Sequence, residues 1–128
     1  MKQSEYIPGD WVKASDQLCR VEEVFVNRLT KEYEYTLIYP NGNSSRIVIG
    51  EIEPIPLTPE ILEKNGWKED RGDYIHKEHF LILCKKYDSY SAYESINDSN
   101  IVSLRDIKYV SDLQHLLFGI DIDSELKI

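Results

Sequence analysis

Residues 53–67 read Glu53-Pro54-Ile55-Pro56-Leu57-Thr58-Pro59-Glu60-Ile61-Leu62-Glu63-Lys64-Asn65-Gly66-Trp67, and this pattern predicts a break between two units of the chain. Three prolines within six residues end any preceding β pairing, because proline donates no hydrogen bond to a strand ladder. Thr58 is then predicted to cap a helix whose first position is Pro59, and Asn65-Gly66 to end that helix. The sequence therefore predicts one unit over residues 1–56 and a second over residues 57–128.

Upstream of this break, short strand-like runs alternate with turns. Residues 32–39 form the clearest strand pattern, because tyrosine and leucine side chains recur at every second position. Pro40-Asn41-Gly42-Asn43 predicts a hairpin turn, and Glu22-Glu23 interrupts the alternation of an earlier strand, which predicts a bulge. Five short strands in about fifty residues predict a small, bent β-barrel of the SH3-like kind.

Downstream of the break, the pattern predicts a helix, an antiparallel meander and a second helix, and so an α+β fold class. Residues 69–73 read as a charged turn that precedes the strands. After the strands, the apolar positions change to helical spacing from Val110 to Leu117, and Gly119 is expected to stop that helix. Residues 120–128 alternate again and are expected to add an edge strand. The strands predicted for this unit are 74–76, 80–86, 89–96 and 101–104.

The charge of the chain disfavours a nucleic acid partner. The 128 residues include 23 acidic and 15 basic side chains, for a net charge of −8. Residues 1–56 hold six basic and nine acidic side chains, and the remainder holds nine basic and fourteen acidic, so neither unit offers a basic field. Binding driven by phosphate contacts needs such a field.

Nothing in the sequence predicts a membrane or secreted location. The longest apolar run, Phe80–Cys84, is far too short to span a bilayer. The residues after Met1 contain no apolar segment of the kind found in secretory signals. Cys19 and Cys84 lie within strand-like runs and are expected to be reduced thiols of the core. We therefore expect a cytoplasmic protein.

Two resemblances add to this interpretation. Gly-Asp-Trp-Val at residues 9–12, followed by Val-Glu-Glu-Val at 21–24, resembles the opening strands of SH3-like barrels of the KOW and Tudor type. The pair of motifs at residues 55–67 and 107–119 resembles a group of uncharacterised small proteins of Bacteroides-type gut bacteria, their prophages and their mobile elements. The second resemblance implies an intracellular protein encoded by a prophage or mobile element, and it carries no catalytic residues over.

The tyrosines are the leading candidates for a binding site. Tyr33, Tyr35 and Tyr39 share one face of the predicted strand, and Trp11 belongs to the same unit. Aromatic rows of this kind supply large contact areas at low entropy cost, so they favour a groove for a protein or peptide segment. The same row is more typical of ordinary barrel core with some exposed strand aromatics.

The sequence offers few residues for metal or catalytic chemistry. Two histidines, His76 and His79, lie close together, and Asp73 or Cys84 could supply a third metal ligand. His76 and His79 could reach one ion only if residues 77–79 turn, because positions three apart on a strand point to opposite faces. Ser111 and His115 share a helix, but no Gly-x-Ser-x-Gly elbow accompanies them. No phosphate-binding or dinucleotide-binding glycine motif is present either. We therefore expect no metal, no cofactor and no enzymatic activity.

These observations favour a non-enzymatic protein-interaction module that binds a protein or peptide. The alternative is an acidic protein that acts in a nucleic-acid process, either as a DNA mimic and inhibitor or as a weak binder through the barrel. The sequence leaves the oligomeric state and the identity of the partner open.

Overall fold

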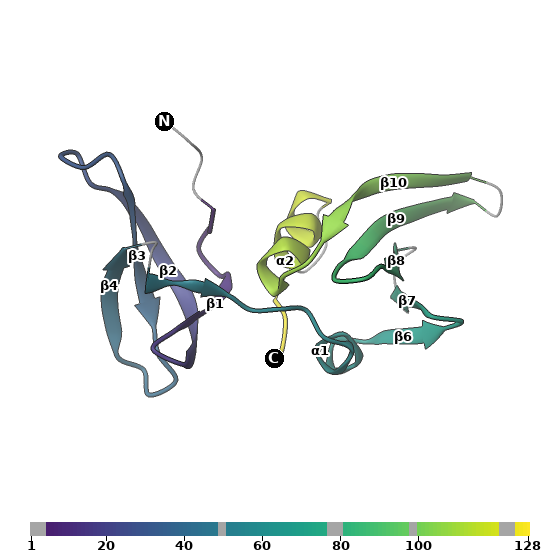
Figure 1. Ribbon diagram of the computed structural model, residues 1–128, viewed down its shortest axis with the longest axis horizontal. Helices are drawn as coiled ribbons and strands as arrows, with labels where there is room; N and C mark the ends of the chain where they lie inside the picture. Colours follow the sequence, from purple (N-terminus) through teal and green to yellow (C-terminus); the bar gives the residue numbers. More distant parts are fainter. Residues whose placement is uncertain (1–4, 49–50, 77–80, 98–99, 121–124) are drawn as a thin grey trace. The chain divides into compact units, whose positions relative to one another are not determined.

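The chain forms two compact units, Met1–Ile55 and Pro56–Ile128. The computed structural model describes residues 5–48, 51–76, 81–97, 100–120 and 125–128 (Figure 1). Both units contain an antiparallel sheet, and the second adds two helices, so the fold is of the mixed α+β kind that the sequence predicts.

The N-terminal unit is a five-stranded antiparallel sheet in the order β4-β3-β2-β1-β5. The first four strands follow one another as a meander, and the short β5 returns to pair with β1, where Val12 lies opposite Pro54. The bulge predicted at Glu22-Glu23 is present as a register shift between Val21 and Glu23. The strands are β1 (Trp11–Ala14), β2 (Gln17–Val26), β3 (Tyr33–Ile38), β4 (Ser44–Val48) and β5 (Glu53–Pro54).

One face of this sheet forms the core of the N-terminal unit. Tyr35 and Leu37 of β3 are fully buried there, and the ring of Tyr6 meets that of Tyr35 edge to face at 5.5 Å. Tyr33 and Tyr39 are partly buried and pack against the same cluster. The buried members are Tyr6, Val12, Ala14, Cys19, Val21, Tyr35, Leu37, Ile47 and Ile52.

The C-terminal unit places its two helices before and after a five-stranded meander in the order β10-β9-β8-β7-β6. Each strand pairs antiparallel with the next, as short connections allow. The elements are α1 (Pro59–Lys64), β6 (Trp67–Asp70), β7 (Asp73–His76), β8 (Leu81–Lys85), β9 (Tyr90–Asn97), β10 (Asn100–Ile107) and α2 (Val110–Gly119).

Helix α1 begins and ends where the sequence predicts. Thr58 is its N-cap, with the side-chain hydroxyl accepting a hydrogen bond from the backbone N–H of Ile61 at 3.3 Å. Pro59 occupies the first turn, and Gly66 takes a positive φ of 87° directly after the C-cap residue Asn65. The helix therefore starts at the cap motif and stops at the Asn-Gly pair.

Helix α2 also matches its predicted span, and it is anchored at its first turn. The carboxylate of Asp112 accepts hydrogen bonds from the backbone N–H groups of Lys108 and Tyr109, at 3.1 and 2.9 Å. A carboxylate in the first turn suits the positive end of the helix dipole. The backbone N–H of Leu57 donates to the carbonyl of Lys108 at 3.0 Å, which ties the start of the unit to the end of β10.

The structure corrects the sequence interpretation of residues 69–73. Glu69 and Asp70 belong to β6, and the turn that joins β6 to β7 consists of Arg71 and Gly72 alone. Both turn residues have positive φ, 56° and 89°, which is the geometry of the tightest hairpins. The sequence analysis assigned five charged or glycine residues to the turn, whereas the turn needs only two and the others belong to strands. Residues 125–128 form no strand, and residues 121–124 of the predicted edge strand lie outside the described residues.

One face of the C-terminal sheet and the apolar sides of both helices make the second core. Trp67, Leu83 and Ile107 from the sheet are almost completely buried, as are Leu62 of α1 and Leu113 of α2. Helix α1 lies against β6. The pKa of Tyr74 is raised, mainly by burial and then by the nearby carboxylates of Glu69, Glu63 and Glu60.

Candidate binding surface

The three tyrosines predicted to form a binding face belong mainly to the core. Tyr35 is 0% exposed, so its ring cannot contact a partner, and that part of the prediction is wrong. Tyr33 and Tyr39 are half-buried against the same cluster. The strand alternation is correct, but the face with the tyrosines is the one that faces Tyr6, which places it inside the unit.

The fourth predicted residue, Trp11, lies on the opposite face of this sheet. Directly opposed residues of antiparallel strands point to the same side. Trp11 is opposed to Arg20 on β2, and Arg20 is opposed to Ile38 on β3, so the three form a row across the sheet. Their neighbours Val12, Cys19 and Leu37 point into the core, which leaves this row on the outer face.

Two more side chains extend this row into what we call the outer patch. Lys13 and Leu18 are opposed to each other in the β1–β2 pair and lie two residues from Trp11 and Arg20 along their strands. Leu18 is 42% exposed and Ile38 is 37% exposed, so both aliphatic side chains reach solvent. The outer patch consists of Trp11, Lys13, Leu18, Arg20 and Ile38.

Contacts with the preceding turn hold the centre of the outer patch in place. The guanidinium carbon of Arg20 lies 5.0 Å from the centroid of the Trp11 ring, and its Nη2 donates to the carbonyl of Gly9 at 3.1 Å. Gly9 has a positive φ of 96°, and its N–H donates to the carbonyl of Val21 at 2.8 Å. The side chain of Asp10, 2% exposed, accepts from the N–H of Ile7 at 2.9 Å. Arg20 and Trp11 are therefore stacked on each other before any partner arrives.

The charge of the outer patch differs from that of the whole chain. Lys13 and Arg20 are its charged members, whereas the protein carries a net charge of −8. Acidic residues lie at its rim: Asp16 approaches Lys13 at 3.8 Å, and Glu53 is opposed to Lys13 in the β1–β5 pair. The Lys13–Asp16 pair is exposed, with Asp16 96% accessible, so it holds Lys13 only weakly.

Of the two histidines considered as metal ligands, only His76 lies among the described residues. The ring of His76 packs edge to face against that of Trp67, with centroids 5.0 Å apart, while His79 lies outside the described residues. In the ranges that the structure describes, no group of three His, Cys, Asp or Glu side chains could hold a metal ion.

The helix residues considered for catalysis, Ser111 and His115, both belong to α2. Ser111 is 5% exposed and His115 is half-buried. Asp112, between them, binds the two backbone N–H groups at the start of this helix. Both cysteines are free thiols. Burial raises the pKa of Cys19, and burial together with a hydrogen bond to Asp73 raises that of Cys84. A raised pKa disfavours the thiolate, which is the nucleophilic form of cysteine.

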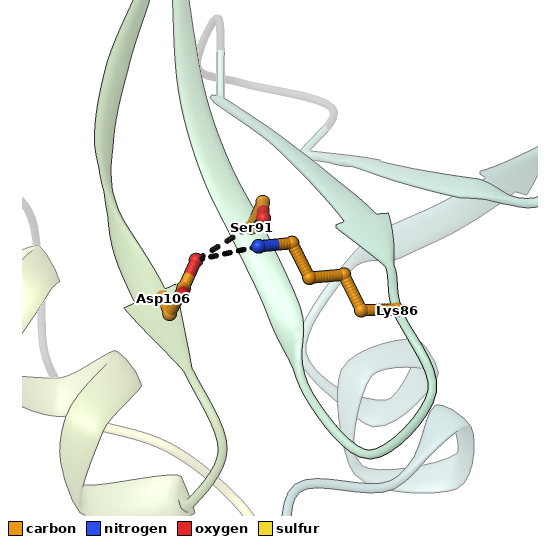
Figure 2. A network of polar contacts seen from close by, with 3 residues as sticks. All are labelled: Lys86, Ser91 and Asp106. Carbon is orange, nitrogen blue, oxygen red and sulfur yellow. Dashed lines mark hydrogen bonds and ion pairs between the residues drawn. The ribbon is translucent and has the colours of Figure 1, made fainter.

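A polar network that the sequence analysis did not find joins three segments of the C-terminal unit (Figure 2). The carboxylate of Asp106 on β10 accepts hydrogen bonds from Lys86 Nζ at 3.2 Å and from the hydroxyl of Ser91 on β9 at 3.1 Å. Asp106 and Ser91 are opposed in the sheet register, and Ser91 is 5% exposed. The network therefore connects the β8–β9 turn and β9 to β10, and its Lys86–Asp106 pair is exposed, so this pair holds the turn only weakly.

This network makes a testable pH prediction. The Lys86 and Ser91 hydrogen bonds favour the charged carboxylate, so the pKa of Asp106 in the folded protein is below its ordinary value of 3.8. Its contribution to stability is complete above the unfolded-state pKa and is lost as pH falls through the folded-state pKa. We expect an NMR titration of the Asp106 carboxyl to show the lowered pKa, and Lys86→Met to raise it. An unchanged midpoint in that variant would contradict the assignment.

Comparison with known proteins adds no assignment: no protein-family model, curated protein or solved structure matches the chain. Within the described residues, neither helix has the length and apolar character needed to cross a membrane. The outer patch combines exposed apolar side chains with a stacked pair of Trp11 and Arg20.

Proposed function

We propose that this protein is a non-enzymatic interaction module whose N-terminal unit binds a protein segment through the outer patch. The segment would carry both apolar and acidic side chains. The observation that carries the proposal is the stacked pair of Arg20 and Trp11 at the centre of an exposed row that includes Ile38.

Interface energetics favour this use of the outer patch. Tryptophan and arginine are the residue types most enriched at energetic hot spots of protein interfaces, and hot spots are surrounded by contacts that exclude water. Leu18 and Ile38 supply apolar area next to the pair, and it is removed from water only if a partner covers it. Because Arg20 is already held by Gly9 and Trp11, little side-chain entropy is lost on binding.

The charges of the outer patch favour a short acidic segment over a nucleic acid. Lys13 and Arg20 can pair with one or two carboxylates of a bound segment. A nucleic acid would extend beyond them, since it carries a charge about every 1.7 Å of duplex, and it would meet a protein of net charge −8. We expect the repulsion between the nucleic acid and the net negative charge of the protein to exceed the attraction of Lys13 and Arg20 for phosphates.

We also propose that the N-terminal unit is a small barrel of the SH3-like kind, in a protein that works inside the cell and is encoded by a prophage or mobile element. The return of β5 to β1 and the bulge in β2 support the barrel, since both bend a meander toward closure. The motifs at residues 55–67 and 107–119 support the origin and location.

A peptide selection tests the binding proposal. The full chain is used to select from a random peptide library, and the selected peptides are titrated against the wild type and Trp11→Ala. We expect enrichment of peptides with acidic and apolar residues, and an affinity loss of about 30-fold in Trp11→Ala, as for a hot spot worth about 2 kcal/mol. Arg20→Lys should also weaken binding, because lysine keeps the charge but loses the planar stacking.

The matched control is Phe118→Ala, which removes a ring that is 68% exposed on α2 of the other unit. It should leave peptide affinity unchanged. Equal affinity of the wild type and Trp11→Ala would refute the proposed surface. Micromolar binding of labelled duplex DNA that weakens steeply with salt would favour the nucleic-acid alternative.

A further inference from the structure

The side chain of Asn65, at the end of α1, binds the backbone of a residue 62 positions further along the chain. Its Nδ2 donates to the carbonyl of Lys127 at 2.7 Å, and its Oδ1 accepts from the N–H of Lys127 at 2.8 Å. The second proton of Nδ2 is directed to the carbonyl of Ile61 at 2.7 Å. These three partners fix the orientation of the amide, because only nitrogen can donate to the two carbonyls.

This pairing reproduces the way in which a β-strand binds its neighbour. In a strand pair, one residue exchanges an N–H and a C=O with the residue opposite, and the Asn65 amide offers the same donor and acceptor to Lys127. A contact to backbone atoms alone does not depend on which side chain residue 127 carries. The Asn65 amide can therefore hold any residue except proline at that position.

The side chains around Lys127 alternate between buried and exposed. Leu126 is 5% exposed, whereas Glu125 and Lys127 are exposed. This period of two is typical of an extended segment that turns every second side chain toward the protein. Lys64 Nζ adds a longer contact of 3.4 Å to the carbonyl of Ile128. Backbone contacts combined with burial of alternate side chains are the basis of peptide recognition by strand addition.

We propose that the end of α1 is a docking site for an extended peptide segment and that residues 125–128 are its resident ligand. Asn65 binds the segment backbone, and the core of the C-terminal unit accepts a leucine one residue before the bound position. The ligand class is thus an extended peptide with a leucine one residue before the residue whose backbone Asn65 binds. This site belongs to the C-terminal unit and does not depend on the outer patch.

The first test asks whether Asn65 holds the resident segment in the full chain. Asn65→Asp keeps the size and the acceptor but turns a carboxylate toward the carbonyls of Ile61 and Lys127. We expect the Lys127 amide to be protected from hydrogen exchange in the wild type, and Asn65→Asp to remove about tenfold or more of this protection. Asn41→Asp is the matched control, because among the described residues the hydrogen bond of the Asn41 side chain is one that its Oδ1 accepts from the N–H of Asn43, and aspartate can accept it too. Unchanged protection in Asn65→Asp would overturn the proposal.

The second test asks whether the site accepts the segment from solution. Leu126→Asp is introduced into the full chain to release the resident segment, and the synthetic peptide Ser-Glu-Leu-Lys-Ile is added. We expect saturable shifts of the Asn65 side-chain NMR signals in the millimolar range, and none with a peptide in which aspartate replaces leucine. The wild type should respond much less, because its own segment competes.

A second variant, Lys127→Pro, allows the same peptide titration if Leu126→Asp does not fold. Lys127→Pro deletes the N–H that donates to Asn65 while leaving Leu126 and α1 intact. The peptide should then shift the Asn65 signals of Lys127→Pro. If neither folded variant responds to the peptide, the site is an internal contact only and the proposal is wrong, whatever the outcome for the outer patch.

Discussion

Tyr35→Ala is expected to destabilise the N-terminal unit by about 3–5 kcal/mol, the range for removing a large buried aromatic side chain. Tyr35 is 0% exposed at the centre of the N-terminal core, and its ring packs edge to face against Tyr6 at an interplanar angle of 78°. Truncation removes both the buried area and the aromatic contact, and leaves a cavity that the sheet cannot close. Urea unfolding followed by the NMR signals of β3 residues measures the loss.

Trp11→Ala is the informative control for this experiment. Trp11 lies on the outer face of the same sheet and is only half-buried, so its removal should cost far less stability than that of Tyr35. Trp11→Ala should reduce peptide binding in a folded protein, whereas Tyr35→Ala should act by unfolding the unit. A stable, folded Tyr35→Ala that has lost only binding would restore the tyrosine face as the functional surface.

Leu62→Ala is expected to destabilise the C-terminal unit by about 2–5 kcal/mol. Leu62 is 0% exposed and is the buried residue of the short helix α1. A helix of six residues has little stability of its own, so α1 depends on this side chain to hold it against the sheet. Unfolding is followed by the fluorescence of Trp67, 2% exposed, in a Trp11→Phe background that removes the other tryptophan.

Substitutions at the N-cap of α1 and at an exposed position of α1 provide a comparison for the stability loss in Leu62→Ala. Thr58→Ala removes the hydroxyl that accepts from the N–H of Ile61 and should cost about 1 kcal/mol. Glu63→Ala, at an exposed position, should change stability by no more than about 0.5 kcal/mol. The expected order of destabilisation is Leu62, then Thr58, then Glu63. Equal midpoints for Leu62→Ala and Glu63→Ala would show that α1 does not depend on burial of Leu62.

Features set by neighbouring residues were predictable from the sequence. The cap at Thr58, the stop at Gly66 and the turn at residues 40–43 all depend on backbone preferences and hydrogen bonds within a few positions. The bulge at Glu22-Glu23 was visible because it breaks a period of two. The charged residues of β6 were misread as a turn because an exposed edge strand carries the same polar residues as a loop.

Which face of the N-terminal sheet is buried could not be predicted from the sequence pattern of its strands. Alternation shows that Tyr33, Tyr35 and Leu37 share a face, but it does not say which of two faces is covered. Both faces of the N-terminal sheet carry large apolar side chains, since Trp11, Leu18 and Ile38 lie on the other one. Burial was decided by Tyr6 and Ile52, which come from distant positions and pack onto the tyrosine side.

The sequence alone therefore determined the two units, the α+β class, the helix limits and most of the strands, because these depend on short-range preferences and on side-chain period. Which aromatic residues are exposed depends on the tertiary structure. The contacts of Asp106 with Lys86 and of Asn65 with Lys127 likewise form only in the folded unit. Contacts between residues 20 and 62 positions apart leave no periodic trace in the sequence. They form only when sheet register and core packing bring those positions together.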